Sequence, residues 1–544
     1  MVCFIVSNFK FVKCLSFINS LLLMIIMEEK DQKTHWADQI ADELIAENDK
    51  EEYTVASGIT PSGVVHIGNF RETITTDLVA KALIHKGKKV RFIYSWDNYD
   101  VFRKVPSNMP KQEELTKWLR HPIVDVPDPF DIEESYARHN EVTVEKYLPI
   151  VGVQPEFISQ AKKYRNCDYA KQIKEAMQAT NEIKEIMNKY RKEDLAEGWY
   201  PTSIFCEKCN KDETKITNYD GEYIVTYSCK CGHTDSFDIR KKGIIKLLWR
   251  VDWPMRWKYE NVDFEPSGKE HSSAGGSNTT AEQIVRKVWN HEPPKHIMYE
   301  FLSIKGMGGK MSSSSGNTVN LEEMLGVYSP ELVRYIFAMR LPKKSFDISF
   351  EGMDVFRAYS EFQQLERIYF GKEECSEEDL PLKKRFYELS SIKIPKELPS
   401  QIDFRYLTSM LQIFQMDMEK VKEKFDVDKI YLEEMIARAK YWLKNYAEEQ
   451  FKFTVQETVS EEAKKELSEN QKSALREFAQ KLSSQSEQEL IPLFKEVSDN
   501  NKIAPKEFFQ AAYTALINKK FGPQLSGFIL TIGFDKVKEL FLQV

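Results

Sequence analysis

The sequence has few cysteines and no marked excess of either charge. Its eight cysteines are spread over 544 residues, too thinly for a disulfide scaffold, and four of them crowd into residues 206–231. A reducing, cytoplasmic compartment is therefore expected. The 77 basic and 84 acidic residues nearly cancel, so the overall charge does not predict a nucleic-acid-binding protein. The cation-rich window at 240–250 leaves two interpretations open, a phosphate-facing strip or a solvated face.

The sequence also lacks an N-terminal apolar run long enough to cross a bilayer. The run covers only residues 14–27, short of the ~20 residues that a membrane helix needs, and no A-x-A cleavage site follows it. We therefore expect no membrane association. An ordinary soluble sequence begins at Met27, so we expect residues 1–26 to be upstream sequence read from a wrong start. A targeting or interfacial segment is the alternative.

The chain is expected to contain a parallel sheet. Hydrophobic residues make up 42% of it, enough for several domains with their own cores. Residues 53–57 and 88–96 have strand character, and residues 69–87 between them have a helical pattern. A strand, a glycine-rich turn, a helix and a strand in this order predict the start of a nucleotide-binding sheet. A further helix is predicted over 279–290 and a strand over 296–304.

Changes of pattern suggest where the domains divide. Residues 27–100 and 241–300 are expected to form the two halves of the sheet domain, with a charged insertion at 101–240 between them. A second unusual loop falls within 301–350. Amphipathic helical patterns without a repeat period follow, and they predict a helical bundle rather than a solenoid over 351–544.

The stretch "GITPSGVVHIGNF" directly after the first strand has the character of a phosphate-binding loop. Gly58, Gly63 and Gly68 allow a ligand to approach the backbone, and the helix that follows directs its N-terminal amides toward phosphate. His66 and Asn69 lie three residues apart at the helix start, where both side chains can face a triphosphate. The alternative is a structural turn with a buried histidine.

A second loop, "GGKMSSSSGN", places one cation among glycines and hydroxyl groups. Lys310 is followed by four consecutive serines, an arrangement that suits the negative charge of a leaving pyrophosphate. The alternative is a serine-rich linker.

The two loops together resemble a known family. "PSGVVHIGN" is similar to the HIGH signature and "KMSSS" to the KMSKS signature of class I aminoacyl-tRNA synthetases, in the same order along the chain. With "SGITPSGVVHIGNFRE", "RVDWPMRW" and "GKEH", the sequence from Thr34 to the C-terminus resembles the class I, archaeal-type lysyl-tRNA synthetases. It departs from the general signatures at Asn69, which replaces a histidine, and at Ser313, which replaces a lysine. Lys305 is the candidate for the missing cation.

The resemblance implies a fold and a reaction. The fold is α/β: a Rossmann-type parallel sheet with a zinc-containing insertion, a KMSKS-type loop with a stem-contact region, and an all-α anticodon-binding domain at the C-terminus. The reaction is ATP-dependent activation of L-lysine to lysyl-adenylate, with Mg²⁺ accompanying ATP, followed by transfer to the terminal ribose of tRNA(Lys). Neither step needs a protein nucleophile, so catalysis rests on positioning and charge stabilisation. A monomer is expected.

The resemblance also implies which residues form the site. The catalytic residues would be His66, Asn69 and Lys310. ATP would be bound by Pro61, Gly63, His66, Gly68, Asn69, Lys310, Met311, Ser312, Ser313 and Ser314. Lysine would be bound by Gly58, Thr60, Asp252, Trp253, His271 and Tyr299. Without the resemblance, the "WPMRW" segment would be interpreted as core.

The clustered cysteines predict a metal site. Cys206, Cys209, Cys229 and Cys231 form a C-x2-C pair and a C-x-C pair, a pattern that suits tetrahedral, structural zinc. His233 is an alternative ligand, since the C-x-C spacing is less usual. Thiols without a metal are the other alternative.

Three other functions remain open on the sequence. A nucleotidyltransferase would share the first loop and the sheet, but would not need the long helical region. A non-catalytic tRNA-binding relative would have lost the ATP loops, which are present here. A glutamate-specific synthetase is the nearest alternative, and the residues alone do not exclude it.

Overall fold

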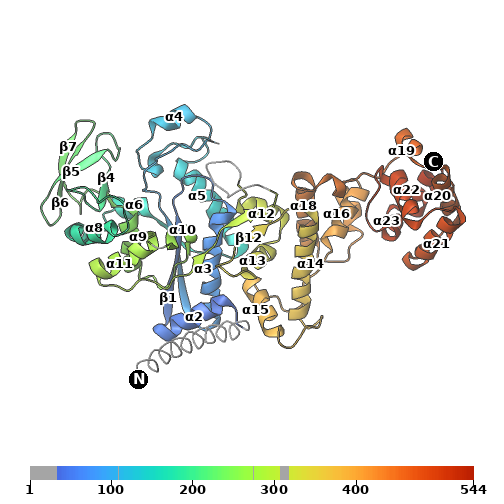
Figure 1. Cartoon of the computed structure of the whole chain (residues 1–544), viewed down its shortest axis with the longest axis horizontal. Coiled ribbons are helices and arrows are strands. Elements are labelled where there is room, and N and C mark those ends of the chain that lie inside the picture. The colour runs from blue at the N-terminus through green and yellow to red at the C-terminus, as the bar shows by residue number, and fades with distance from the viewer. Residues whose placement is uncertain (1–33, 108, 274, 307–317) are drawn as a thin grey trace, which may run out of the picture. The chain divides into compact units, whose positions relative to one another are not determined.

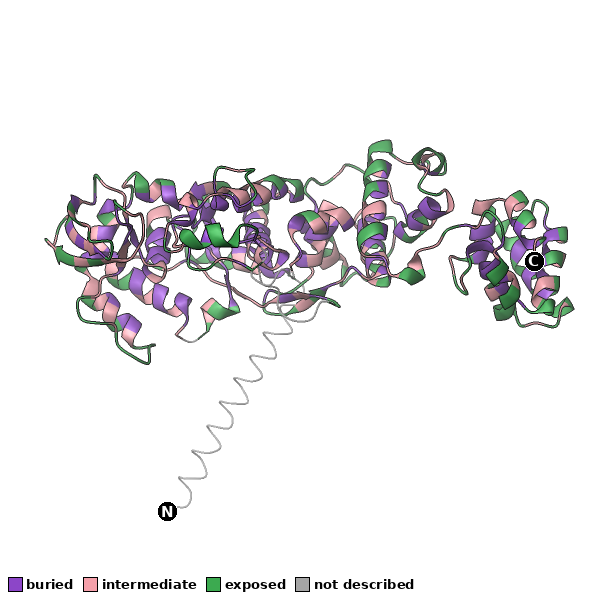
Figure 2. Ribbon diagram, turned by 90° about the horizontal axis from the view of Figure 1, so that it is seen from above, coloured by how far each residue is buried: buried purple, intermediate pink, exposed green. Residues whose placement is uncertain are grey.

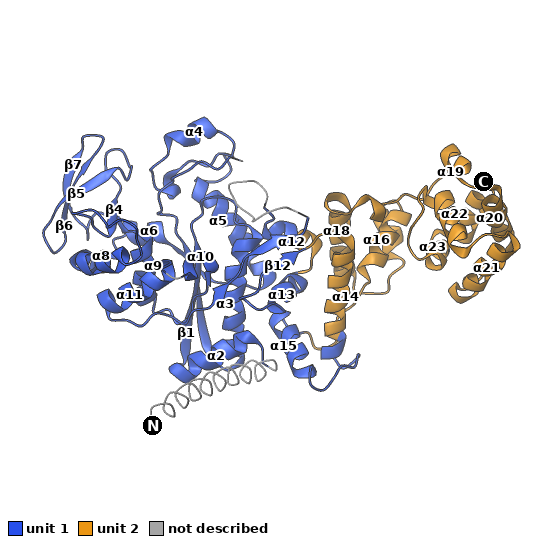
Figure 3. Ribbon diagram, viewed as in Figure 1, with its two compact units in different colours: residues 1–324, 330–348, 367–394 blue, residues 325–329, 349–366, 395–544 orange. Residues whose placement is uncertain are grey.

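The computed structural model describes residues 34–107, 109–273, 275–306 and 318–544. The expected N-terminal extension at 1–26 and the loop that carries Lys310, Met311, Ser312, Ser313 and Ser314 lie outside the described residues. Two compact units divide the chain (Figure 3): unit 1 contains residues 1–324, 330–348 and 367–394, and unit 2 contains residues 325–329, 349–366 and 395–544. No helix in the described part combines the length and the apolar character that a membrane crossing requires.

A parallel sheet forms the centre of unit 1 (Figure 1). β1 (Glu52–Ile59) leads through the first loop into α3 (Ile67–His85), and Gly87, at φ +80°, reverses the chain into β2 (Lys89–Trp96). β2 pairs in parallel with β1 on one side and with β3 (Glu156–Ser159) on the other. The predicted α/β fold with a parallel sheet is confirmed.

Short parallel pairings continue the sheet beyond β1. Single bridges join Val55 to Phe264 and Phe264 to Lys295. Further along, β9 (Ser267–Gly268) pairs with β10 (Met298–Tyr299), and β11 (Leu302–Ile304) pairs with β12 (Phe346–Ile348). Parallel strands bring their carboxyl ends to one edge, which is where such sheets bind ligands.

The strand expected over 296–304 is divided into β10 and β11 by a break at Glu300 and Phe301. Arg71 on α3 explains the break. Its guanidinium donates to the carbonyl oxygens of Phe301 (3.1 Å), Pro342 (2.8 Å) and Lys344 (2.7 Å), so Phe301 bonds to a helix instead of a neighbouring strand.

The region expected to be a single insertion contributes to the sheet as well, because β3 lies within it. Its other elements are helices and the strands of two small antiparallel sheets. The helices are α4 (Gln112–Lys117), α5 (Tyr136–Tyr147), α6 (Gln160–Arg165), α7 (Ala170–Gln178) and α8 (Thr180–Asn188). The strands are β4 (Thr202–Ile204), β5 (Thr214–Tyr219), β6 (Ile224–Cys229) and β7 (Thr234–Asp238), with β4 paired to β8 (Ile245–Leu247) in one sheet and β5 to β7 in the other.

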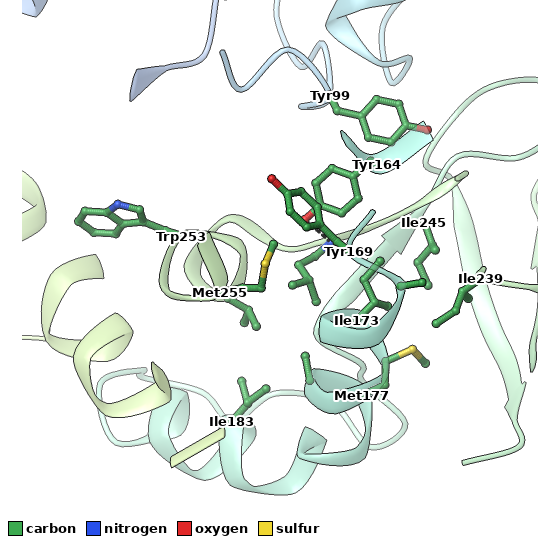
Figure 4. Close-up of a cluster of buried hydrophobic side chains, with 14 of the residues drawn as sticks. Tyr99, Tyr164, Tyr169, Ile173, Met177, Ile183, Ile239, Ile245, Trp253 and Met255 are labelled. Carbon is green, nitrogen blue, oxygen red and sulfur yellow. Dashed lines mark hydrogen bonds between the residues drawn. The ribbon is translucent and has the colours of Figure 1, made fainter. Parts of the chain in front are cut away.

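Aromatic side chains dominate the core where these parts meet (Figure 4). Tyr164 packs edge-on against Tyr169, with ring centres 5.0 Å apart, and stacks with Tyr99 at 5.7 Å. Helix α9 (Trp249–Glu260) adds Trp253 and Met255 to the same cluster. Helices α10 (Lys269–Ser272) and α11 (Ser277–Trp289) follow, the latter where a helix was predicted.

One buried arginine ties together four separate segments of unit 1. Arg334, on α13 (Pro330–Ala338), is 0% exposed. Its guanidinium donates to Asp77 Oδ2 on α3 (2.6 Å), to the carbonyl of Val151 (3.0 Å) and to the carbonyl of Leu389 on α15 (Leu380–Ser390) at 2.9 Å. A charge this deep is stable because it is paired with Asp77 and because each of its three nitrogen atoms donates a hydrogen bond.

Unit 2 is helical, as the sequence predicts. Its longer helices are α14 (Gly352–Tyr369), α16 (Phe404–Ile413), α18 (Lys429–Asn445), α20 (Glu469–Lys481), α21 (Glu487–Asn500), α22 (Pro505–Ile517), α23 (Leu525–Ile532) and α24 (Phe534–Phe541). The short helices of unit 2 are α17 (Met418–Lys422) and α19 (Glu461–Glu466). Of the remaining helices, α2 (Trp36–Glu47) lies in unit 1, and α12 (Leu321–Val327) begins in unit 1 and ends in unit 2. The last helices turn their buried faces inward (Figure 2) around Phe478, Phe494, Phe508 and Phe541.

Candidate active site

Two pockets lie side by side at the carboxyl ends of β1 and β2. The larger has a volume of about 690 Å³ and the smaller of about 470 Å³. Both are lined by Thr60, Asn69, Asp100 and Tyr299, so a molecule in one can react with a molecule in the other across these shared residues.

The larger pocket contains the start of α3. His66 is the residue that precedes the helix, and its backbone N–H donates to Asn69 Oδ1 at 3.1 Å. This bond occupies the carboxamide oxygen of Asn69 and leaves its nitrogen as a donor. Gly68, Arg103 and Lys104 complete the part of the wall that suits an anion, because they join two cations to the positive end of a helix.

The chain that leaves the second loop returns beside the first. The N–H of Ile67 donates to the carbonyl of Val319 at 2.7 Å, and His66 forms an antiparallel bridge with Asn320. Before the loop, the backbone N–H of Lys305 donates to Ile348. The Lys310 loop itself lies outside the described residues, yet its exit is anchored against the helix start.

Two predicted ATP-binding residues take other places. Pro61 is buried, and its carbonyl accepts a hydrogen bond from Asn140 on α5. Gly63 lines the smaller pocket. Both lie in the turn that precedes the helix, so they shape the loop behind His66.

The smaller pocket brings together residues that are far apart in the sequence. Gly58 and Thr60 come from β1 and its loop, Trp253 from α9, His271 from α10 and Tyr299 from β10, and all five line the wall. Gly58 is needed there for a close approach, since a Cβ atom at this position would lie 2.8 Å from the carbonyl oxygen of Ser95.

Asp252, predicted to bind the substrate, is not among the residues that line either pocket. It is buried behind the wall, where it accepts a hydrogen bond from the hydroxyl of Tyr164 and lies 3.3 Å from Arg256. Successive helical residues point in directions about 100° apart. Helix α9 therefore presents Trp253 to the pocket and Asp252 to the core.

Glu72, a half-buried residue of the pocket wall, was not predicted from the sequence. One carboxylate oxygen accepts from Ser57 Oγ and from the N–H of Gly58, both at 3.2 Å, and the other accepts from the Tyr299 hydroxyl at 2.7 Å. Desolvation raises the pKa of Glu72 to about 7, and the Tyr299 hydrogen bond opposes this. A usable signal was its spacing: Glu72 follows Asn69 by three residues, so both lie on one face of α3.

The smaller pocket is strongly acidic. Its wall contains five carboxylates and two cations. Arg256 pairs with Asp97 at 2.7 Å, and the Trp257 indole donates to Glu265 at 2.6 Å. Burial raises the pKa of Asp97 and of Glu265. A ligand with more than one positive charge suits this wall, whose carboxylates are Glu72, Asp97, Asp100, Glu265 and Glu270 and whose cations are Arg103 and Arg256.

The four cysteines of the β4–β7 region gather at one point. Their sulfur atoms all lie within 4.8 Å of one another, with Cys206 and Cys231 at 3.7 Å and Cys209 and Cys229 at 3.6 Å. A tetrahedral zinc with bonds of about 2.3 Å needs sulfur atoms about 3.8 Å apart, so the residues fit this metal. His233, the alternative ligand, lies outside the group, and its ring packs against Tyr227.

Comparison with known proteins agrees with this geometry. A family model described as "tRNA synthetases class I (K)" matches residues 34–393, and one described as "Anticodon binding domain" matches residues 418–539. A protein of Borrelia garinii subsp. bavariensis named "Lysine--tRNA ligase" is 49% identical over 93% of this chain and 98% of its own length. Proteins with the same name from Treponema pallidum and Pyrococcus horikoshii are 41% and 40% identical, over 94% and 92% of this chain and 98% and 97% of their own lengths. With the first signature loop at the carboxyl edge of a parallel sheet, these matches show that the chain belongs to the class I (K) family of tRNA synthetases.

Proposed function

We propose that this chain is a lysine–tRNA ligase, which activates L-lysine with ATP and transfers it to the 3′-terminal ribose of tRNA(Lys). The acidic character of the smaller pocket carries the proposal. Lysine presents two ammonium groups. Asp97 is paired with Arg256 and Asp100 with Lys246, so Glu72, Glu265 and Glu270 are the wall carboxylates that can match them. A glutamate-specific site would need a free cation for the substrate side chain, whereas the buried cation here, Arg256, is already paired with Asp97.

The two pockets divide the work of the first step. Lysine lies in the smaller pocket with its ε-ammonium against Glu72 and Tyr299 and with Trp253 along its stem. ATP lies in the larger pocket, with its phosphates at the start of α3 beside His66 and Asn69. Mg²⁺ bound with ATP would offset phosphate charge. The carboxylate of lysine then attacks the α-phosphate at the shared wall, and Lys310 is proposed to stabilise the departing pyrophosphate.

The helical domain in unit 2 supports tRNA as the partner of this protein. Residues 418–539 match an anticodon-binding family, and a small-molecule nucleotidyltransferase would have no use for such a helical unit. We propose the same domain division as the sequence suggests, with anticodon recognition assigned to 351–544. We also propose a monomer that acts in the cytoplasm.

Amino-acid-dependent exchange of pyrophosphate into ATP tests the proposed function. Lysine should support exchange and glutamate should not, with and without tRNA(Lys). Transfer of labelled lysine to tRNA(Lys) completes the test. Exchange with glutamate in place of lysine would favour the glutamate-specific alternative, and tRNA binding without any exchange would favour the non-catalytic one.

The pH dependence of lysine use provides the first prediction. The pKa of Glu72 is raised to about 7, so its carboxylate is charged above this pH and neutral below it. Because only the charged form attracts an ammonium group, kcat/KM for lysine should rise with pH up to about 7 and then level off. Glu265 and Tyr299 also face this carboxylate. Asp97 is another carboxylate of the pocket wall, its pKa is raised by burial to about 6, and a weaker second limb at lower pH is expected from it. In Glu72→Gln the limb near pH 7 should disappear, and its persistence would assign the titration to another group.

The metal content provides the second prediction. We expect about one zinc per chain, held by Cys206, Cys209, Cys229 and Cys231 in a structural role. Cys209→Ser should lower the zinc content of the purified protein, while Cys375→Ser, whose thiol lies outside this group, should not. An active, fully reduced preparation without zinc would show that the thiols hold no metal.

A further inference from the structure

A buried lysine lies directly behind the wall of the smaller pocket. Lys246 is the middle residue of β8, and its side chain is only 7% exposed. Its neighbours in the strand, Ile245 and Leu247, belong to the apolar core, so the alternation of the strand turns Lys246 the other way. Its ammonium group forms an ion pair with Asp100. A lysine is rarely buried in this way without a partner that it must hold.

Asp100 connects this lysine to the pocket. One of its oxygens pairs with Lys246, and the other accepts a hydrogen bond from the Thr60 hydroxyl at 2.9 Å. Burial raises the pKa of Asp100, but the charge and the hydrogen bond of Lys246, together with the Thr60 hydrogen bond and the Arg103 charge, more than offset this, and the pKa lies below its ordinary value. Asp100 is therefore a carboxylate that accepts hydrogen bonds and cannot donate one.

The ionised Asp100 fixes the orientation of the Thr60 hydroxyl. A hydroxyl group has one proton and two lone pairs, and Asp100 takes the proton. Thr60 lines both pockets, so the part of its oxygen that faces a ligand can only accept. An acceptor at this point matches the α-ammonium of an amino acid and repels its carboxylate.

We propose that Lys246 is a positioning residue for amino-acid recognition. Through Asp100 it fixes the Thr60 hydroxyl as an acceptor for the α-ammonium group of the substrate. This role rests on the proposed lysine-binding function, but it concerns the α-ammonium rather than the side chain that distinguishes lysine from other amino acids.

Three ligands of the smaller pocket separate this role from a general loss of structure. They are L-lysine, cadaverine, which keeps both ammonium groups but lacks the carboxylate, and 6-aminohexanoate, which lacks the α-ammonium. Lys246→Met should weaken L-lysine and cadaverine about tenfold or more, the scale of a hydrogen bond to a charged group, and should leave 6-aminohexanoate nearly unchanged. The KM for ATP should change less than twofold. Lysine is measured by its KM in pyrophosphate exchange, and the two analogues by their inhibition constants.

Two further variants make the test decisive. Thr60→Val, which removes the hydroxyl at similar volume, should give the same pattern, and adding Lys246→Met to it should weaken lysine no further. Lys246→Arg, which keeps the charge, should restore part of the affinity. Lys171→Met, at a side chain that is 73% exposed on α7, is the matched control and should behave like the wild type.

Each other outcome overturns the proposal. Equal weakening of all three ligands by Lys246→Met would show a general change in the pocket, and unchanged lysine binding would show that Lys246 does not act on Thr60. If Lys246→Met does not fold, the pattern of Thr60→Val decides alone, and a Thr60→Val enzyme that keeps wild-type affinity for cadaverine contradicts the proposal. A wild-type enzyme without lysine-dependent exchange would instead refute the proposed function.

Discussion

Replacing Glu72 with glutamine should raise the KM for lysine by about two orders of magnitude or more, while the KM for ATP changes little. The variant keeps the size of the side chain and a carbonyl oxygen that can still accept from Tyr299. It removes the charge that we propose to face the ε-ammonium of lysine in the smaller pocket. Loss of one partner from a desolvated, hydrogen-bonded charge pair costs about 2–5 kcal/mol, and every 1.4 kcal/mol is tenfold in affinity.

Tyr299→Phe is the matched control for Glu72→Gln. It removes only the hydroxyl that donates to Glu72 and should raise the KM for lysine severalfold, since one hydrogen bond to the carboxylate is lost while the charge itself remains. Both variants are measured by lysine-dependent pyrophosphate exchange at pH 8, where Glu72 is charged. A Glu72→Gln enzyme with the wild-type KM for lysine would show that the ε-ammonium binds elsewhere.

Replacing Arg334 with methionine should lower the free energy of unfolding of unit 1 by about 3–5 kcal/mol. The variant keeps the length of the side chain but leaves the Asp77 carboxylate and the carbonyls of Val151 and Leu389 buried without their donor. Breaking a buried ion pair by removing one partner is destabilising to this extent because the other charge stays in the interior. Urea unfolding followed by tryptophan fluorescence measures the loss.

A second substitution distinguishes this explanation from lost packing. Arg334→Met combined with Asp77→Leu should recover part of the stability, since the unpaired carboxylate is then absent. Arg286→Met, at an exposed pair with Glu292, should change stability by less than about 1 kcal/mol. If the double variant is less stable than Arg334→Met alone, the buried charge is not the cause.

The sequence predicts the parallel sheet well because its signals are local. The strand character of residues 53–57, the helical pattern of residues 69–87 and Gly87 at the end of the helix each act within one element. The structure confirms all three, although β1 is buried on both faces. The membership of β3 in this sheet was not predictable in the same way. Its four residues lie far from β2 in the sequence, in a charged region, and only pairing in space identifies them.

The candidate site also contains residues with a local sequence signal and residues that only the folded structure identifies. His66, Asn69 and Tyr299 were predictable because they belong to short motifs or to segments that resemble a family. Glu72 was harder to predict. Its spacing from Asn69 places it on the same face of α3, but a carboxylate within a helix usually faces solvent, and only the return of β10 buries it against Tyr299. The different places of Asp252 and Trp253, both expected to bind lysine, have a similar origin, because the sequence does not reveal which side of α9 faces the pocket.

Helix α3 contributes residues to the walls of both pockets and so connects them structurally. The start of the helix places His66 and Asn69 at the larger pocket. The next residues form hydrogen bonds to the opposite wall: Arg71 donates to the carbonyl of Phe301, and Glu72 accepts from the hydroxyl of Tyr299. In the proposed arrangement of the substrates, a shift of this helix on ATP binding would therefore also move the wall of the smaller pocket. Any factor by which ATP changes the affinity for lysine must equal the factor by which lysine changes the affinity for ATP. The helix is thus a route for thermodynamic coupling between the two substrates before any bond is formed.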